Sequence, residues 1–217
     1  MTRKAGFFQA AIGAIGEKRS GVICANATCR IKPDRAMLAY ENITMSGVME
    51  VARTDRLLLR WLDADDAGFI LELLNEPPWI RYIGDKKVQT LQDAQRYIRN
   101  GPAAMYERLG FGLYLVQLKQ GGEPIGICGL IKREALDDVD LGFAFLQRFW
   151  GNGYAFEAAA AIMAYGTSVL GLSRLVAILS PDNLRSHELL KRLGFRPEGE
   201  IRLGPDDKPV ALYAFAA

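Results

Sequence analysis

The chain is poor in the residues on which several common active-site and structural designs depend. It has one histidine, His187, and no recognisable Ser-His-Asp set, so hydrolase interpretations lack support. Its three cysteines are an odd number, and Cys24-x4-Cys29 has no further Cys or His nearby to complete a zinc site. Cys128 lies in an apolar segment, which predicts a reduced thiol in a cytosolic protein. No apolar run approaches about 18 residues, so no membrane span is expected.

A surplus of one charge is also missing from most of the chain. The 217 residues carry a net charge of +2, and half of them are hydrophobic, which predicts one folded domain with a sizeable core. Residues 1–48 hold 7 Lys/Arg against 3 Asp/Glu, whereas residues 49–217 hold 20 against 22. A nucleic-acid-binding face would need a basic surplus in the folded region, so no nucleic-acid partner is expected.

A glycine-rich junction between a strand and a helix is the most informative feature that the sequence does contain. An alternating strand over residues 139–146 leads into Gln147-Arg148-Phe149-Trp150-Gly151-Asn152-Gly153-Tyr154-Ala155, and an Ala-rich helix begins near Tyr154. A helix start presents unpaired N–H groups and the positive end of its dipole, and glycines let a phosphate approach the backbone closely. The junction therefore predicts an anion site.

Spacing excludes two common nucleotide loops at this junction. A P-loop needs a lysine after its second glycine, and none follows Gly153. A dinucleotide fingerprint needs a small residue where Phe156 stands, and an acid about 20 residues further on. The junction alone leaves one alternative open, a tight strand-to-helix turn without a ligand.

Three segments together resemble one known family. Arg148-x-x-Gly151-x-Gly153 resembles the pyrophosphate loop of the GCN5-related N-acetyltransferase (GNAT) superfamily. Asn183-x-x-Ser186, followed by residues 191–195, resembles the second cofactor element of that family. Residues 54–60 resemble the first strand of its RimJ/RimL-like branch, which acetylates protein N-termini. The resemblance covers roughly residues 50–217.

The resemblance implies an α/β protein of the GNAT fold: a mixed, mostly antiparallel central sheet with flanking helices and a splayed strand pair that holds acetyl-CoA. The expected acetyl-CoA-binding residues are Phe145, Leu146, Arg148, Gly151, Asn152, Gly153, Tyr154, Ala155, Asn183 and Ser186. No metal is expected to take part in the reaction.

Local patterns predict the elements around the junction. A capping pattern at Asp63-x-x-Asp66 predicts the start of one helix, which Pro77-Pro78 stops. A second pattern at Thr90-x-x-Asp93 predicts another helix, which Gly101-Pro102 breaks or restarts. Gly121-Gly122 predicts a hairpin between strands at about 112–118 and 125–131. A buried strand over residues 174–180, a short helix that ends at Gly194 and a terminal hairpin complete the order.

Asp140 is the candidate general base. Alternation places Asp140 on the same strand face as the small residues Gly142 and Ala144, where a substrate could fit. The RimL-like pattern has an acid two residues before Gly-Tyr/Phe, and Asp140-Leu141-Gly142-Phe143 matches it with Asp for the more usual Glu. A water could bridge the shorter side chain to the substrate. The alternative is a solvated strand-edge carboxylate, and Asp137 and Asp138 are interpreted as turn residues.

Ser186 is the second catalytic candidate. Many relatives use a tyrosine on this helix to protonate the departing thiolate, but the position four residues after Ser186 is Leu190. The Ser186 hydroxyl is then expected to donate to the sulfur or simply to cap the turn. Asn183 either binds the cofactor or serves as the helix N-cap. His187 is interpreted as a subsidiary surface residue, because adjacent helical residues do not face each other.

The expected function is acetyl-CoA-dependent N-acetyl transfer to a primary amine in the cytoplasm. An α-amine with a pKa of about 7.8 is about 14% neutral at pH 7, against about 0.04% for a lysine near 10.4, so one modest base suits a protein N-terminus or a low-pKa small amine. The alternatives are a small-molecule N-acetyltransferase acting on an antibiotic, a polyamine or an amino acid, and a non-catalytic acyl-CoA-binding module. A monomer or homodimer is expected, without a membrane partner.

Two further interpretations concern the aromatic residues and the N-terminus. The aromatic residues around the cofactor loop are expected to pack beneath it rather than to stack on bases; these are Phe149, Trp150, Tyr154 and Phe156. The aromatic residues of the front half either shape an acceptor groove or close the core; these are Trp61, Trp79, Tyr82 and Tyr106. Residues 1–48 show no sustained period and are expected to be a poorly ordered extension or the product of an upstream start. The acetyltransferase domain is expected over residues 49–217.

Overall fold

The computed structural model describes residues 49–205 and 207–217, and the prediction for the extension over residues 1–48 lies outside them. The strands are β1 (Glu50–Arg53), β2 (Leu57–Arg60), β3 (Leu113–Leu118), β4 (Pro124–Ile131), β5 (Val139–Phe145), β6 (Arg174–Leu179), β7 (Arg196–Ile201) and β8 (Val210–Ala216). The α-helices are α2 (Ala67–Asn75), α3 (Pro77–Tyr82), α4 (Leu91–Ile98), α5 (Ala104–Leu109), α6 (Tyr154–Ser168) and α7 (Leu184–Arg192). Short 3-10 turns precede α2 and follow β5.

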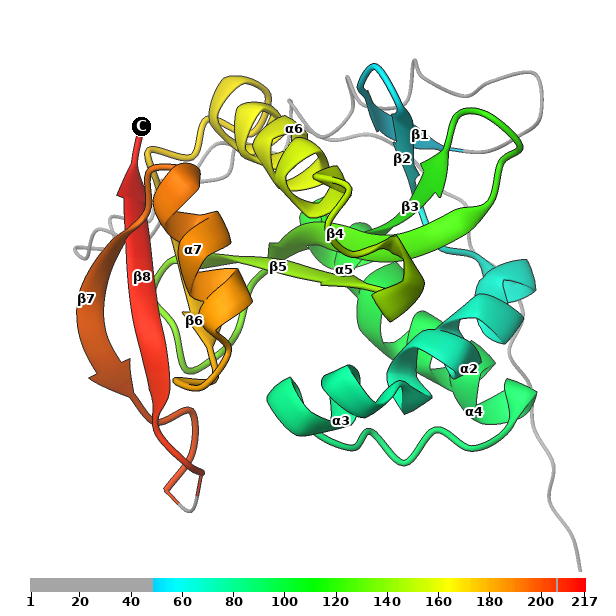
Figure 1. The fold of residues 1–217 in the computed structure, drawn as a ribbon, viewed down its shortest axis with the longest axis horizontal. Coiled ribbons are helices and arrows are strands. Elements are labelled where there is room, and N and C mark those ends of the chain that lie inside the picture. Colours follow the sequence, from blue (N-terminus) through cyan, green and yellow to red (C-terminus); the bar gives the residue numbers. More distant parts are fainter. Residues whose placement is uncertain (1–48, 206) are drawn as a thin grey trace, which may run out of the picture. The chain divides into compact units, whose positions relative to one another are not determined.

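The described strands form one mixed sheet in the order β1-β2-β3-β4-β5-β6-β8-β7 (Figure 1). Every neighbouring pair is antiparallel except β5 and β6, which are parallel and are joined through α6. This arrangement confirms the predicted fold class, an antiparallel front half with a single parallel crossover.

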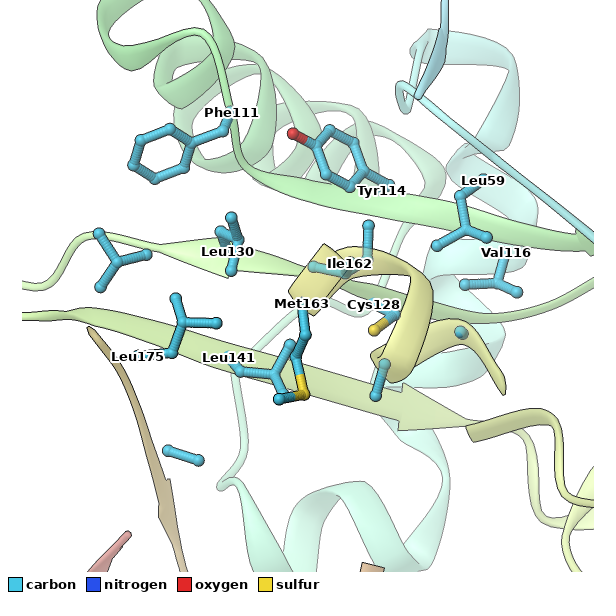
Figure 2. Close-up of a cluster of buried hydrophobic side chains, with 14 of the residues drawn as sticks. Leu59, Phe111, Tyr114, Val116, Cys128, Leu130, Leu141, Ile162, Met163 and Leu175 are labelled. Atoms are coloured by element: carbon cyan, nitrogen blue, oxygen red, sulfur yellow. The ribbon is translucent and has the colours of Figure 1, made fainter. Parts of the chain in front are cut away.

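Helices cover both faces of the sheet and divide the core in two. On one face, Ile162 and Met163 of α6 pack over Tyr114, Leu130 and Leu141 of the central strands (Figure 2). On the other face, α2 and α4 bury apolar side chains against β3 and β4, namely Ile70, Leu73, Ala94 and Ile98 against Leu115 and Ile127. The alternation of β5 follows this division, which confirms that its odd and even residues lie on opposite faces.

The local turn and capping signals of the sequence are present in the structure. Asp63 and Asp66 form a capping box ahead of α2, and Thr90 and Asp93 form another at the start of α4. Gly121 and Gly122 take the left-handed φ values of +86° and +69° in the β3–β4 turn. Such φ values are unstrained only for glycine, which explains why the hairpin is visible in the sequence.

Two elements differ from the prediction. Residues 54–60 are not one strand, because Thr54 closes a tight turn by donating its N–H to the Leu57 carbonyl (3.0 Å), and β1 precedes that turn. The helix after Thr90 neither stops nor restarts at Pro102 but runs through a π-helical segment, Arg99–Ala103, into α5. The Ala104 N–H bonds the Arg99 carbonyl five residues back, which is the π pattern.

Candidate functional site

Strands β5 and β6 are paired only at their beginnings. The paired residues are Val139 with Leu175 and Asp140 with Val176, and beyond them the strands diverge (Figure 1). Leu146 donates its N–H to the Ile125 carbonyl of β4 (3.0 Å), so even residues of β5 bond to β4 and odd residues face β6. The backbone groups of Phe143 and Phe145 therefore point into the gap between the two strands.

One of these backbone groups in the gap already has a partner. The Trp150 indole Nε1 donates to the Phe145 carbonyl oxygen at 2.8 Å. This bond leaves the N–H of Phe145 and both backbone groups of Phe143 facing the gap. Such an unpaired strand edge accepts an extended guest chain.

The predicted glycine loop lies at the end of β5. Gly151 and Gly153 have φ values of +81° and +80°, and an added Cβ at Gly151 would meet no atom within 4 Å. The first backbone bond of α6 runs from the Glu157 N–H to the Gly153 carbonyl (3.1 Å). The N–H groups of the first three residues of α6 thus have no acceptor in the described part of the chain. Unpaired N–H groups in this arrangement can bind an anion at the start of a 15-residue helix.

A network from the β1–β2 turn supports the loop, and no pattern in the sequence predicted this network. Arg56 donates Nε to Glu157 (2.7 Å) and Nη1 to the Asn152 carbonyl (3.0 Å), and its guanidinium lies 4.5 Å from the Tyr154 ring centre. Glu157 also accepts from the Arg56 N–H (3.0 Å) and the Thr54 hydroxyl (2.5 Å). These bonds fix the position of the loop relative to α6.

The predicted loop residues do not all face the anion site. Arg148 pairs with Glu72 of α2 and lies 3.8 Å from Glu123, so its charge is directed toward carboxylates. Leu146 is fully buried in the core beneath α2 and α4. Asn152 is exposed and donates its side-chain amide to the carbonyls of Phe149 (3.1 Å) and Trp150 (3.3 Å).

Helix α7 supplies two positive charges that face the loop. The Arg185 guanidinium lies 5.4 Å from the Trp150 ring centre, and that of Arg192 lies 4.8 Å from the Phe156 ring centre. Neither arginine forms a salt bridge with the described residues. Neither arginine was predicted as a site residue, because basic residues on a short polar helix are typical of a solvated face.

Asn183 and Ser186 lie at the start of α7. Asn183 Oδ1 accepts from the Ser186 N–H (3.2 Å), so Asn183 is the helix N-cap. Ser186 is half-buried, and its hydroxyl makes no hydrogen bond to the residues that the structure describes. His187 bonds the buried Tyr213 hydroxyl through Nδ1 (2.8 Å) and the Pro181 carbonyl through Nε2 (3.2 Å). It therefore stabilises the contact between α7 and β8.

Asp140 lies where β5 and β6 begin to part, and it is not a solvated carboxylate. It is 1% exposed, so that alternative interpretation is wrong. Arg133, in the loop before β5, donates Nε to Asp140 Oδ2 at 2.7 Å. Oδ1 has no hydrogen-bond partner of ordinary geometry among the described residues, although the Ile178 N–H of β6 faces the carboxylate. Burial raises the pKa of Asp140, and the charge and hydrogen bond of Arg133 oppose that rise.

Most of the aromatic residues singled out in the sequence belong to the core. Trp61 stacks on Tyr106 with ring centres 4.4 Å apart, and Tyr106 stacks on Tyr114 at 5.6 Å. Trp79 is buried beside α2. Phe149, Trp150 and Tyr154 pack against the core beneath the loop, as predicted. These aromatics close the core, which was one of the two interpretations.

The described residues contain no group of three or more His, Cys, Asp or Glu side chains that could hold a metal ion. Cys128 is buried, and burial raises the pKa of its thiol. Within the described part of the chain, no helix has the length and apolar character needed to cross a membrane.

Comparison with known proteins identifies the family. Residues 56–196 match the model of the acetyltransferase (GNAT) domain. The chain is 30% identical over 154 residues to the uncharacterized N-acetyltransferase YoaA of Bacillus subtilis, which covers 70% of this chain and 86% of YoaA. It is 35% identical over 91 residues to the [ribosomal protein uS5]-alanine N-acetyltransferase of Escherichia coli, which covers 41% of this chain and 45% of that protein.

A solved structure agrees at the level of the fold. The RimL ribosomal L7/L12 α-N-protein acetyltransferase in complex with coenzyme A superposes with a TM-score of 0.66 at 19% identity, covering 77% of this chain and 97% of that chain. The chain belongs to the GNAT family, and it is an N-acetyltransferase.

The geometry of the site fits acetyl-CoA as the acetyl donor. The loop offers unpaired N–H groups and two glycines whose missing side chains leave room for a pyrophosphate. The gap offers the unpaired edge of β5 to an extended pantetheine arm. Both features lie at the same end of β5, which allows one molecule to occupy both.

Proposed function

We propose that this N-acetyltransferase moves the acetyl group of acetyl-CoA to a primary amine, and specifically to the α-amine of a protein N-terminus. The observation that carries the proposal is the position of Asp140. The carboxylate lies at the point where the gap between β5 and β6 opens, directly beside the unpaired strand edge. A general base at that point is within reach of an amine that approaches the end of a guest chain in the gap.

The chain's own groups would hold the donor in two places. The N–H groups at the start of α6 would bind the pyrophosphate, with Gly151 and Gly153 allowing its close approach. The Phe145 N–H and the Phe143 carbonyl would pair with the pantetheine arm. When bound, the donor supplies a thioester whose carbonyl carbon is open to attack by an amine. Fixed positioning of the two reactants lowers the entropic part of the barrier.

Three groups would then act on the reacting atoms. The Phe143 N–H, which is closer to Asp140 along β5, would donate to the thioester carbonyl oxygen as charge develops on it. Asp140 would accept a proton from the amine, either directly or through a water, as the new C–N bond forms. The Ser186 hydroxyl, which has no partner in the described part of the chain, would donate to the departing sulfur. A simple thiol has a pKa of about 8.5, so a hydrogen bond suffices to stabilise the departing thiolate without proton transfer.

Two observations favour an α-amine over a lysine side chain. An α-amine is neutral far more often at pH 7, so one buried carboxylate suffices as its base. In addition, the uS5-alanine N-acetyltransferase acts, by its name, on an alanine of a ribosomal protein, and the RimL neighbour is named as an α-N-protein acetyltransferase. These likenesses support the class of acceptor without identifying the protein that carries it.

A thiol-release assay tests the proposal. The protein is incubated with acetyl-CoA and single amines: peptides with a free α-amine, the same peptides with that amine blocked and a lysine left free, and polyamines. We expect release with free α-amines to exceed release with blocked peptides. Equal thiol release with polyamines or free lysines would contradict a protein N-terminus as the preferred acceptor. No thiol release with any amine would contradict the whole proposal.

Replacement of the proposed base is the sharper test. Asp140→Asn keeps the size of the side chain and removes its basicity, so we expect kcat to fall by about 10²-fold or more. The affinity for acetyl-CoA, measured by calorimetry, should remain. Asp138→Asn is the matched control, because Asp138 lies two residues away and is bound to Arg174 (2.8 Å). Near-normal turnover of Asp140→Asn across pH 6 to 9 would remove Asp140 from the mechanism.

A further inference from the structure

Arg133 is the ion-pair partner of the buried Asp140 carboxylate and uses only part of its bonding capacity. Its side chain is 36% exposed, whereas that of Asp140 is 1% exposed, so the arginine is the member of the pair that reaches solvent. Only Nε is bound to Asp140, at 2.7 Å. The two Nη atoms have no acceptor among the residues that the structure describes. A forked pair of donors therefore remains available beside the proposed base.

Neighbouring charged groups do not compete for these donors. Asp138 is bound to Arg174, and Lys132 donates Nζ to the carbonyls of Leu136 and Asp137. Tyr97 of α4 also lies close to Arg133: burial raises the pKa of its hydroxyl to about 12, and the charge of Arg133 opposes that rise. Arg133, a residue of the β4–β5 loop, thus lies near α4, on the sheet face opposite α6.

This placement has a consequence for any amine that reaches Asp140. A planar guanidinium with two free N–H edges matches a carboxylate and binds it through two parallel hydrogen bonds. The same positive charge repels acceptors that carry extra ammonium groups, such as polyamines. An acceptor with an acidic group next to its amine would place that group on Arg133 and the amine near Asp140.

We propose that Arg133 binds a carboxylate of the acceptor, so that the preferred acceptor is an α-amine with an acidic group within a few bonds. This inference rests on the proposed amine acetylation at Asp140. Two kinds of molecule carry an α-amine with a nearby acidic group: a peptide whose first or second residue is Asp or Glu, and a free amino acid. Arg133 is then a specificity-determining residue in addition to the partner of Asp140.

The test compares acceptors in the wild type and in Arg133 variants. The acceptors are a Glu-first peptide, its Gln-first isostere, a Lys-first peptide and free glutamate, each assayed for kcat and KM. We expect the wild type to prefer the Glu-first peptide over its Gln-first isostere by about 10-fold or more, the scale of one charge-assisted hydrogen bond. Arg133→Gln should abolish this preference through KM, with acetyl-CoA affinity unchanged.

Controls separate recognition from support of the base. Arg133→Lys keeps a positive charge near Asp140 but removes the fork, so it should fold even if Arg133→Gln does not, and should still lose most of the preference. Arg174→Gln removes the arginine bound to Asp138 and should leave the preference intact. If free glutamate but not the peptides shows the Arg133 effect, the acidic acceptor is an amino acid.

The outcomes that overturn the inference differ from those that overturn the proposed function. Equal kcat/KM for Glu-first and Gln-first peptides in the wild type would contradict it, as would a preference for the Glu-first peptide that persists in Arg133→Gln. If no amine releases thiol, the proposed function fails. The inference can then still be tested by calorimetry of the Glu-first peptide with protein saturated with coenzyme A. It requires that the peptide binds to the wild type and that this binding is lost in Arg133→Gln.

Discussion

Asp140 and Arg133 form an ion pair in which only the arginine reaches solvent. Burying a carboxylate is costly, and one hydrogen bond from Arg133 does not satisfy both of its oxygens. Buried carboxylates with a shifted pKa cluster at functional sites, and a base beside a reacting amine is one role for such a group. The pair thus links the packing of the sheet to the chemistry of the gap.

The pKa of Asp140 should respond directly to its partner. Burial raises this pKa, and Arg133 is the largest influence that holds it down, so Arg133→Gln should raise it further. A general base must be deprotonated to accept a proton, so if Asp140 has the proposed role, the pH below which turnover is lost should rise with its pKa. Carbon-13 NMR titration of the Asp side-chain carboxyls measures the shift, with Arg174→Gln as the control. An unchanged pKa in Arg133→Gln would show that burial alone determines it.

Asp140 could be selected from the sequence, whereas its partner could not. The alternation of β5 and the Asp-Leu-Gly-Phe spacing place the carboxylate on the correct face. Several basic residues stand near several acids in this region, and sequence spacing does not determine which pair forms. Only the turn between β4 and β5 brings Arg133, and not Lys132, onto Asp140. For the same reason, the supporting bonds of Arg56 across to α6 were not predicted.

At the scale of elements, the β5–loop–α6 unit depends on two residues in left-handed conformations. Gly153 is the N-cap of α6, with φ +80°, and a Cβ there would meet only the Arg56 guanidinium at 3.5 Å. Local signals of this kind could be recognised in the sequence, namely glycines at positions with a positive φ and carboxylates in capping boxes. The turn at Thr54 and the π segment around Pro102 were not, because tertiary contacts choose between conformations of similar local energy.

Gly153→Val should block the anion site while the domain remains folded. A branched side chain at a positive φ strains the turn and fills the space needed for a pyrophosphate. We expect acetyl-CoA affinity, measured by calorimetry, to fall by at least about 10-fold, the loss of one good charge-assisted contact. Gly121→Val, at φ +86° in the open β3–β4 turn, carries similar strain away from the site and is the control. Equal affinity in both variants would contradict the loop assignment.

Glu157 ties the β1–β2 turn to α6, and its contribution should depend on pH. Burial raises the pKa of Glu157, but bonds from Thr54 and Arg56 outweigh burial, and the pKa lies below its ordinary value of 4.5. A carboxyl of this kind stabilises the fold above its unfolded pKa, and the stabilisation is lost as the pH falls through its folded pKa.

Glu157→Gln should therefore lower the free energy of unfolding at pH 7 by about 1 kcal/mol, since Arg56 is partly screened by solvent. The difference from the wild type should narrow as the pH falls below about 4.5. Urea unfolding at pH 7 and in mild acid measures both quantities. Glu188→Gln, an exposed carboxylate paired with Lys191, serves as the control and should change little. A deficit of the same size at both pH values would contradict the ionic account.

At the scale of the whole molecule, the described residues close their own core on both faces of the sheet. The order of strands and helices followed from local patterns and from the family resemblance, including the single parallel crossover. The family resemblance implied a splayed strand pair, but it could not show that β5 and β6 share only two paired positions.

A chain that begins at Met49 should retain stability and activity. The Met49 carbonyl accepts from the Trp61 N–H (3.0 Å), so this cut keeps the outer strand pair intact. We expect the melting temperature to stay within a few degrees and thiol release to persist. A fall of more than about 8 °C would correspond to several kcal/mol and would show that residues 1–48 pack on the domain. Differential scanning calorimetry of the two chains decides this.

The sparse pairing of β5 with β6 also divides the sheet into two panels, β1–β5 and β6–β8–β7. Few backbone bonds join the panels, so helix packing and the occupant of the gap carry much of their cohesion. A donor molecule that bonds to β5 while its sulfur meets Ser186 of α7, the helix that packs on β6, would connect the two panels. Its binding free energy adds to the cohesion of the fold, so the donor concentration would also set how firmly the two panels are held together.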